Sequence, residues 1–416
     1  PGLARLQPGH PGKPLLPALV QKHVSAARGG ADIWQPSPKV SMYRYQKNHR
    51  FIAQVAQGLE KLGAQEIQEL GGTKVRPGYR SISFQADQAA LYRITLHARI
   101  ISRVLIPLLR FDCHSDRYLY KTAGNIPWSD ILGLDQTFAV FANVSHSKIR
   151  HSQYAALKVK DAIVDQFRKD LGTRPNIDPQ SPDVWIHLHI ENNTATLSLD
   201  GSGGSLHRRG YRVQSVPAPM QETLAAAIIT FTGWDLKAPL MDPMCGSGTL
   251  LCEALIRGAH IPAGFLRPHF GFEYLPDFDP ILWSSIREEA ESSITDIPQG
   301  LIMGSDQDAQ AIQAAKANCR QLPGGDRIPV HQAPFEHTSG VNKGIIVCNP
   351  PYGRRLQDEN RVSTLLQDFG HYLREHCSGS KAYIYLGSRD LHRHIPLSPA
   401  WTKTLTNGGL EGCLAK

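Results

Sequence analysis

Four residues, Asn349 to Tyr352, carry the sharpest chemical signal in the chain. They read Asn-Pro-Pro-Tyr and directly follow the apolar run 345–348, which predicts a buried strand that ends at Cys348. Because two prolines fix the backbone and remove two N–H donors, the Asn349 side-chain oxygen and the Pro350 carbonyl can both accept from one amino group. Accepting both protons of an exocyclic amine localises its lone pair, which stabilises the transition state of attack through nitrogen. Tyr352 offers a ring for a base to stack on. The structural alternative is a plain proline-rich turn.

A second motif, DPMCGSGT at residues 242–249, follows a short strand and opens a helix predicted over 250–257. Gly246 and Gly248 let the backbone approach a ligand, and the free N–H groups at the helix start favour an anion. The motif lacks the lysine of a phosphate loop and the third glycine of a dinucleotide fingerprint. Asp242 before the turn favours a ligand that also carries positive charge. S-adenosylmethionine, with its amino, carboxylate and sulfonium groups, fits that description.

Asp306 ends the tripeptide Gly-Ser-Asp after the predicted strand 301–303. An acid at this place can accept hydrogen bonds from both ribose hydroxyls of a nucleoside. The alternative role is the N-cap of a helix over 309–320, which Asp308 would fill equally well. Asp306 lies farther from the glycine turn than the roughly 20 residues of a simple βαβ unit, and an insert over 261–297 accounts for the difference.

A glycine-rich basic stretch, GSGGSLHRRGYR at residues 201–212, precedes these motifs. Arginines and a tyrosine beside flexible glycines suit phosphate contact and base stacking, although an ordinary basic linker has the same composition. The formal net charge of +8 is divided unevenly, with +12 in residues 1–214 and −4 in residues 215–416. This asymmetry indicates a nucleic-acid-binding front half, or a basic surface kept for solubility. The candidate RNA contacts are Arg208, Arg209, Tyr211 and Arg212.

The alternation of apolar segments predicts the elements that position these residues. Residues 215–416 alternate helix and strand, which indicates an α/β domain with a mostly parallel sheet, and Asn407-Gly408-Gly409 predicts a hairpin that reverses a strand at the sheet edge. Residues 43–110 and 111–214 each read as a small α+β layer. Residues 1–42 hold many prolines and little periodicity, and are interpreted as a flexible extension, a mis-annotated upstream stretch or a targeting segment.

Several classes of protein are disfavoured by composition. No apolar run approaches about 18 residues, so no membrane span is expected, and the opening stretch lacks a secretory apolar core. The seven cysteines form no C-x-x-C pair, and no zinc-finger or H-E-x-x-H spacing occurs. Reduced thiols, no metal and a cytoplasmic location are therefore expected. His187 and His189 alternate along a predicted strand and are expected on one solvated face.

The order of the three motifs and the closing hairpin resembles class I S-adenosylmethionine-dependent methyltransferases that act on an amino nitrogen. Residues 205–212, 218–227 and 407–411 are similar to the RlmL/YcbY family, which methylates guanine N2 in large-subunit ribosomal RNA, and the similarity runs from about Tyr43 to the end. The resemblance implies a Rossmann-like methyltransferase domain over 215–416, preceded by a ferredoxin-like domain over 43–110 and a THUMP RNA-binding domain over 111–214.

The resemblance also implies roles for individual residues. Asn349, Pro350 and Tyr352 would hold the target base, and Asn349 would also border the cofactor. Two departures stand out: Pro334 occupies about the place of the family's adenine-side acid, where Glu336 or a backbone group would have to substitute, and the chain stops before the second methyltransferase domain that some members carry. The residues implied to bind the cofactor are Asp242, Pro243, Gly246, Gly248, Thr249 and Asp306, with Glu222 and Thr223 on the preceding helix.

Other readings remain open at this point. The same tetrapeptide would serve adenine N6 in RNA or DNA, and a non-catalytic RNA-binding assembly factor would keep a relict cofactor pocket. The motifs leave the target nucleotide and the oligomeric state undetermined. The expected partner is ribosomal RNA, with no membrane.

Overall fold

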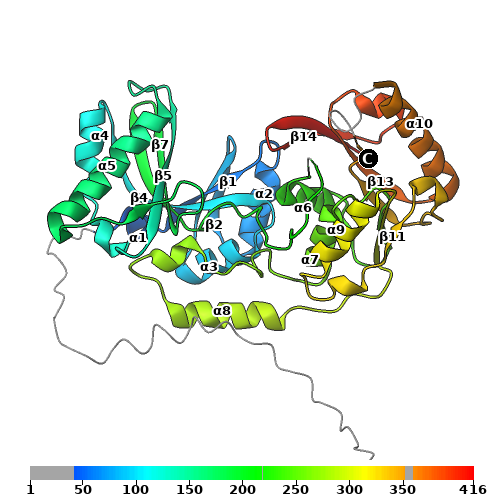
Figure 1. The fold of residues 1–416 in the computed structure, drawn as a ribbon, viewed down its shortest axis with the longest axis horizontal. Helices are drawn as coiled ribbons and strands as arrows, with labels where there is room; N and C mark the ends of the chain where they lie inside the picture. The colour runs from blue at the N-terminus through cyan, green and yellow to red at the C-terminus, as the bar shows by residue number, and fades with distance from the viewer. Residues whose placement is uncertain (1–41, 218, 352–358) are drawn as a thin grey trace, which may run out of the picture. The chain divides into compact units, whose positions relative to one another are not determined.

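The structure is a computed structural model that describes residues 42–217, 219–351 and 359–416 (Figure 1). The expected extension before Met42 and the candidate base-stacking residue Tyr352 lie outside the described residues. Residues 42–416 form one compact unit by their internal contacts. Two sheets organise this unit, one of eight strands and one of seven.

The eight-stranded sheet contains all the strands up to residue 200, in the order β2-β3-β1-β4-β8-β7-β5-β6. Along β7 the residues Val184, Ile186, Leu188 and Ile190 are buried and the intervening ones are more exposed, so one face of this part is covered and the other is open. Helix α5 packs against β5 on the covered face. The elements are α1 (Arg44–Asn48), β1 (Arg50–Val55), α2 (Glu60–Glu69), β2 (Thr73–Gly78), β3 (Ser81–Gln85), α3 (Gln88–His97), β4 (Ile101–Asp112), α4 (Asp116–Ala123), β5 (Thr137–Ser145), α5 (Ser152–Leu171), β6 (Asn176–Ile177), β7 (Val184–Glu191) and β8 (Thr194–Asp200).

Strand β4 joins the two expected α+β layers into one sheet. Its first part pairs with β1, as in Ile52 opposite Leu105, and its second part pairs with β8, as in Arg110 opposite Thr196. The expected boundary between residues 110 and 111 therefore falls inside a continuous strand. The sequence patterns of this half did not indicate α1, β2 or α4.

The seven-stranded sheet has the order β11-β10-β9-β12-β13-β15-β14. The first five strands are parallel, and β15 runs antiparallel to β13 and β14. The predicted fold class, a mostly parallel sheet with a reversed C-terminal strand, is confirmed, and the reversed strand lies one place in from the edge. The elements are α6 (Glu222–Phe231), β9 (Leu240–Asp242), α7 (Thr249–Gly258), α8 (Pro280–Ser292), β10 (Ile302–Asp306), α9 (Ala309–Cys319), β11 (Val330–Gln332), β12 (Ile345–Cys348), α10 (Glu359–His376), β13 (Lys381–Leu386), β14 (Thr402–Asn407) and β15 (Leu410–Ala415).

The closing hairpin follows directly from its sequence. Asn407 pairs with Leu410, so Gly408 and Gly409 form a two-residue turn, with φ of 59° and 103°. Such primed turns require positive φ at both central positions, which glycine adopts without steric cost.

The insert between α7 and β10 packs onto the N-terminal sheet's helices rather than forming a free loop. Helix α8 lies against α3, and Tyr92 of α3 stacks on Phe272 of the insert with ring centroids 4.4 Å apart. Trp283 of α8 meets Phe272 edge-on at 5.0 Å. Buried aromatic pairs contribute stability beyond their area. The insert therefore ties the two halves of residues 42–416 together.

No helix among the described residues is long and apolar enough to cross a membrane. No group of three or more His, Cys, Asp or Glu side chains that could hold a metal ion occurs in this part of the chain. The prediction for the two histidines of β7 is half wrong: His189 is 51 % exposed, but His187 is only 16 % exposed because it stacks on Phe141 and approaches Asp200 at 3.7 Å.

Candidate active site

A pocket lies at the carboxyl ends of β9 and β12, where two of the sequence motifs meet. Asn349 lines it together with residues of the glycine turn and the segment before α6. Carboxyl ends of neighbouring parallel strands meet at one edge of an α/β sheet, where such folds bind their ligands. The lining residues are Val216, Pro219, Met220, Asp242, Met244, Cys245, Gly246, Ser247, Thr249, Leu250 and Asn349.

The glycine turn needs its glycines for conformation and for packing. Gly246 has φ of 52° and Gly248, the N-cap of α7, has φ of 79°. A Cβ on Gly248 would lie 3.1 Å from the Cβ of Ala315 on α9, whereas one on Gly246 would lie 3.9 Å from Cγ2 of Val216, an ordinary contact. The two glycines therefore differ: packing on α9 and positive φ both favour glycine at 248, whereas at 246, which lines the pocket, positive φ is the main demand.

Asp306 holds the glycine turn at the end of β10. Its Oδ2 accepts from the Gly246 amide at 2.8 Å, and its Oδ1 accepts from the Asp308 amide at 3.0 Å. The N-cap of α9 is Asp308, whose carboxylate accepts from Gln310. The structure thus removes the alternative role for Asp306. Each carboxylate oxygen keeps a lone pair beyond these bonds, so hydroxyl donors can still be accommodated.

Asp242 is a buried acid that has no counter-ion among the residues that the structure describes. It is 1 % exposed, and its one hydrogen bond among the described residues comes from the Met244 amide at 3.2 Å. Burial raises the pKa of Asp242 well above its usual range, and the negative charge of Asp306 raises this pKa further. A cationic ligand group next to Asp242 would offset both effects. The electrostatics therefore fit a ligand with positive charge at this point.

Asn349 presents an unused acceptor to the same pocket. Its Oδ1 atom is buried and has no hydrogen-bond partner among the described residues. A buried polar atom without a partner costs about 1–3 kcal/mol, and β12, buried along its whole length, fixes its position. The arrangement is that of an acceptor awaiting a donor such as an amino group.

Arg212 was predicted to contact RNA, but in the structure it positions residues around the pocket. Its guanidinium donates to Glu222 Oε1 at 2.9 Å, to Ser247 Oγ at 3.1 Å and to the Met220 carbonyl at 3.0 Å. It thereby joins the glycine turn to the start of α6. Glu222 and Thr223 are buried there. One carboxylate oxygen of Glu222 accepts the hydrogen bond from Arg212, so that oxygen serves the protein and not a ligand.

Arg209 and Tyr211 correct the expectation of RNA contact. Arg209 is 2 % exposed and pairs with Glu253 Oε1 of α7 at 3.2 Å, and the fully buried Tyr211 donates its hydroxyl to the same atom at 3.0 Å. Arg267 holds the glycine-rich segment in place by donating to the carbonyls of Ser202, Gly203, Ser205 and Arg208. The segment is packed, and of the four candidates Arg208 alone is exposed. Composition could not reveal this because buried and exposed arginines look alike in sequence.

The adenine side of the expected cofactor site carries no acid in the predicted place. Pro334 follows Ala333, whose amide donates to the Asp306 carbonyl at 3.0 Å, and Glu336 is exposed. The backbone at Ala333 is therefore bonded to the end of β10. Pro350 is buried directly after Asn349.

A matched glycine pair tests the packing role of Gly248. Gly248→Ala should lower the free energy of unfolding by about 2–3 kcal/mol, since it adds a methyl contact to the strain of positive φ. Gly300→Ala is the control: its φ of 78° is nearly the same, and a Cβ there meets nothing within 4 Å. Urea denaturation of both variants checks this. Equal losses would show that φ alone, and not the Ala315 contact, demands glycine at 248.

Family models match nearly the whole described chain. A model described as RMKL-like, methyltransferase domain matches residues 209–416. A THUMP domain model matches residues 114–200, and an RlmL ferredoxin-like domain model matches residues 50–105.

Similar proteins of known sequence carry methyltransferase names. A protein of Synechocystis sp. named "Putative RNA methyltransferase slr0064" is 39 % identical over 367 residues, which are 88 % of this chain and 96 % of that protein. Ribosomal RNA large subunit methyltransferase K/L of Syntrophotalea carbinolica is 40 % identical over 376 residues, or 87 % of this chain and 52 % of that protein. The chain spans about half the length of the K/L relatives it matches.

Solved structures share the fold. A structure described as "SMU.472, a putative methyltransferase complexed with SAH" has a TM-score of 0.78 at 27 % identity, covering 88 % of this chain and 97 % of that one. A Listeria monocytogenes protein described as a predicted N6-adenine-specific DNA methylase has a TM-score of 0.77 at 29 % identity, covering 89 % and 96 %.

Proposed function

Because the chain belongs to the RMKL-like methyltransferase family and carries RlmL ferredoxin-like and THUMP domains, we propose that it methylates the N2 amino group of a guanine in large-subunit ribosomal RNA. The names of the K/L relatives support ribosomal RNA as the substrate. The single observation that carries the choice of an amino nitrogen is the buried, unpartnered Oδ1 of Asn349 in the pocket beside the glycine turn.

The methyl donor is S-adenosylmethionine, which supplies an electrophilic methyl group on a sulfonium when it is bound. The residues present fit it: Asp242 is a buried acid without a counter-ion among the described residues, and Gly246, with φ of 52°, lines the pocket with its backbone. Asp242 would face the cationic part of the methionine moiety, and the free lone pairs of Asp306 would accept from the ribose hydroxyls. Pro243, Gly248 and Thr249 would shape the turn around it.

The chain's own residues position the amine and stabilise its developing charge. The Asn349 Oδ1 and the Pro350 carbonyl would accept the two amine protons, so that the nitrogen lone pair points at the methyl group. As nitrogen gains positive charge during attack, these two acceptors bind its protons more strongly than in the ground state. The proton leaves after attack, and water can take it.

We further propose that residues 43–110 and 111–214 hold the RNA while residues 215–416 carry out the transfer. A guanine within a duplex would have to be flipped out to reach the buried Asn349. The surplus of basic residues in the first half supports this division of labour.

Nucleoside mass spectrometry tests the chemistry. The purified chain is incubated with S-adenosylmethionine and ribosomal RNA from a strain lacking it, and the RNA is digested. N2-methylguanosine is the expected product. N6-methyladenosine would overturn the guanine assignment in favour of adenine, the base named for the Listeria structure. Absence of any transfer, together with no heat of cofactor binding by calorimetry, would favour the non-catalytic RNA-binding role.

Asp242 predicts a pH effect with a definite sign. Burial raises the pKa of Asp242 in the free protein. The folded state is therefore favoured at low pH, where Asp242 is protonated, and the folded protein loses this stability as the pH rises through the raised pKa. Asp242→Asn should therefore unfold at a higher temperature than the parent at pH 8, while binding S-adenosylhomocysteine at least tenfold more weakly. Thermal unfolding with and without the ligand from pH 5 to pH 8 measures both. A variant less stable than the parent at pH 8 would contradict the uncompensated burial.

A further inference from the structure

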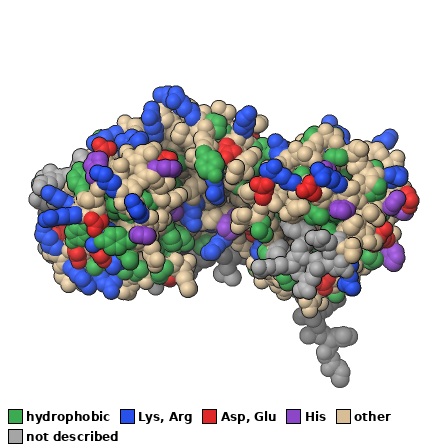
Figure 2. Space-filling view, turned by 90° about the horizontal axis from the view of Figure 1, so that it is seen from above, with side chains coloured by type: hydrophobic (Ala, Val, Ile, Leu, Met, Phe, Trp, Pro, Cys, Tyr) green, Lys and Arg blue, Asp and Glu red, His purple; other side chains and the backbone are tan. Residues whose placement is uncertain are grey.

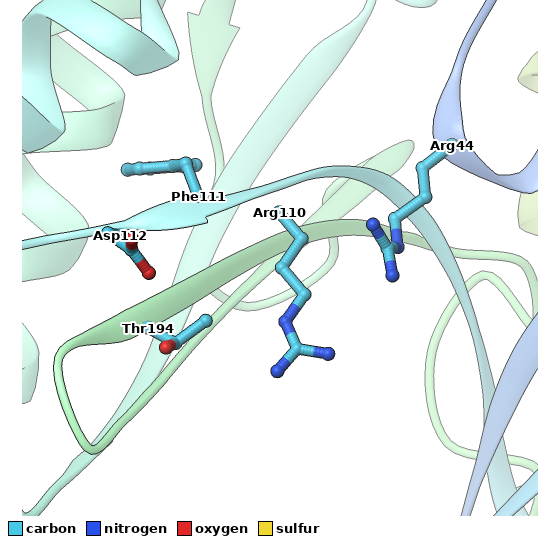
Figure 3. Close-up of a pocket in the computed structure, with 5 residues that line it drawn as sticks. All are labelled: Arg44, Arg110, Phe111, Asp112 and Thr194. Carbon is cyan, nitrogen blue, oxygen red and sulfur yellow. The ribbon is translucent and has the colours of Figure 1, made fainter.

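We propose that the pocket between α1 and the second half of β4 binds one nucleotide of an RNA strand and distinguishes RNA from DNA through Asp112. The pocket is lined by Arg44, Arg110, Phe111, Asp112 and Thr194 (Figure 3). It lies in the N-terminal sheet, away from the residues of the candidate active site. The proposal deepens the proposed function, on which it rests for RNA as the substrate.

Two guanidinium groups are available to a phosphate in this pocket. Figure 3 shows the side chains of Arg44 and Arg110 pointing to the same side of β4. Neither has a hydrogen bond or an ion pair with any described residue, and Arg110 is exposed. Two arginines near the active site are in contrast paired with buried acids, Arg209 with Glu253 and Arg212 with Glu222. Each free guanidinium presents a planar set of N–H donors that matches the oxygens of a phosphate, so two of them on one side of β4 favour phosphate binding.

The register of the sheet explains why these groups converge. Arg110 lies opposite Thr196 and Asp112 lies opposite Thr194 in the pairing of β4 with β8. Directly paired residues, and residues two apart on one strand, share a face of the sheet. Phe111, between them, points to the other side and contacts Tyr118 at a centroid distance of 6.2 Å. The alternation therefore places both polar groups on the open face.

Asp112 gives the pocket its selectivity. It is exposed and has no ion pair with a described residue, so its carboxylate is free to accept. A carboxylate beside a phosphate site is repulsive unless a hydroxyl lies between them, and RNA supplies a 2′-hydroxyl next to each phosphate where DNA has none. Thr194 adds a hydroxyl that can donate to phosphate. Two cations, one acid and one hydroxyl thus match a ribonucleotide.

The rest of the open face suits the same strand. Phe141, Trp185 and His187 form a stacked column there, with centroid distances of 4.9 Å between the first two and 5.7 Å between Phe141 and His187. His189 follows on the same face and is 51 % exposed. Phosphate-binding cations beside half-buried rings are typical of surfaces that bind single strands. In Figure 2, Lys and Arg side chains are also numerous over the left-hand part, which carries β5 and β7 in Figure 1.

Fluorescence anisotropy with the full chain tests the pocket, using labelled single-stranded RNA and DNA of one sequence, about twelve nucleotides long. Arg44→Ala/Arg110→Ala should weaken RNA binding at least tenfold and reduce the slope of log K against log salt by about 1.4. Asp112→Asn should reduce the preference for RNA over DNA at least fivefold, chiefly by improving DNA binding. The substitution removes the repulsion between the Asp112 carboxylate and a DNA phosphate, which has no neighbouring 2′-hydroxyl to separate the two charges.

The matched controls are Lys169→Ala and Asp170→Asn on α5, exposed residues without a described partner on the covered side of the sheet. Both should leave the affinities unchanged. Equal effects of test and control variants, or RNA binding that resists the arginine double variant, would overturn the proposal. A labelled hexaglutamate peptide is used as a second probe. If this peptide binds the chain and is displaced by unlabelled peptide but not by RNA, the pocket belongs to an acidic protein partner, which would also overturn the proposal. N2-methylguanosine formation by the parent chain is scored separately, so failure of this pocket leaves the proposed function intact, and failure of that function leaves the binding result readable.

Discussion

Asn349→Ala should lower the rate of methyl transfer by about 10²–10³-fold, the loss typical of one preorganised acceptor or donor at a reacting centre. The reason is the position of its Oδ1, which is buried at the end of β12 and has no other partner among the described residues. A contact made chiefly in the transition state affects kcat, whereas the cofactor binds mainly through other groups. Single-turnover transfer of a labelled methyl group to ribosomal RNA measures the rate.

Two further measurements make the Asn349 result specific. Calorimetry with S-adenosylhomocysteine should give a dissociation constant within about threefold of the parent, which shows that the pocket is intact. Asn349→Asp keeps an acceptor oxygen in the same place and should retain more activity than Asn349→Ala. Full turnover by the alanine variant would refute the role assigned to Asn349, and equal loss in both variants would point to packing instead.

Arg209→Met should lower the free energy of unfolding by about 3–5 kcal/mol, because it leaves Glu253 buried without its partner. Arg209 also donates to the carbonyls of Leu206 at 2.7 Å and of Arg99 at 2.5 Å, so its loss removes links between the end of α3 and helix α7. Burial already raises the pKa of Glu253 despite Arg209, which shows how costly the lone charge would be. Urea denaturation measures the loss.

A double variant separates this buried pair from RNA contact. Arg209→Met/Glu253→Met replaces both charges with apolar side chains of similar length and should recover most of the lost stability. RNA affinity of the double variant should equal that of the parent, because neither side chain reaches the surface. If Arg209→Met were as stable as the parent but bound RNA several-fold more weakly, the sequence interpretation of Arg209 as an RNA contact would be right and the buried ion pair unimportant.

The sequence alone determined the parts of the molecule that depend on neighbouring residues. Apolar runs of four to six residues bounded by glycine and proline predict strands such as β12, and Asp87 and Asp308 cap their helices as their positions suggest. The motif at 349–352 could be assigned to a strand end because it directly follows such a run, and the motif at 242–249 because it follows the short strand predicted at residues 240–241. The meeting of Asp242 and Asn349 in one pocket then follows from parallel strand order, which alternating helices and strands impose.

The tertiary structure decided which side chains are buried and which are exposed. Arg208, Arg209 and Arg212 are chemically alike in sequence, yet one is exposed and two are bonded to Glu253 and Glu222, because the packing of 201–212 against α7 and α6 sets their directions. Likewise, β4 continues through an expected domain boundary because its pairing with β8 is non-local. Sequence patterns record local conformation and periodicity, whereas burial of a charge depends on the partner that long-range folding brings to it.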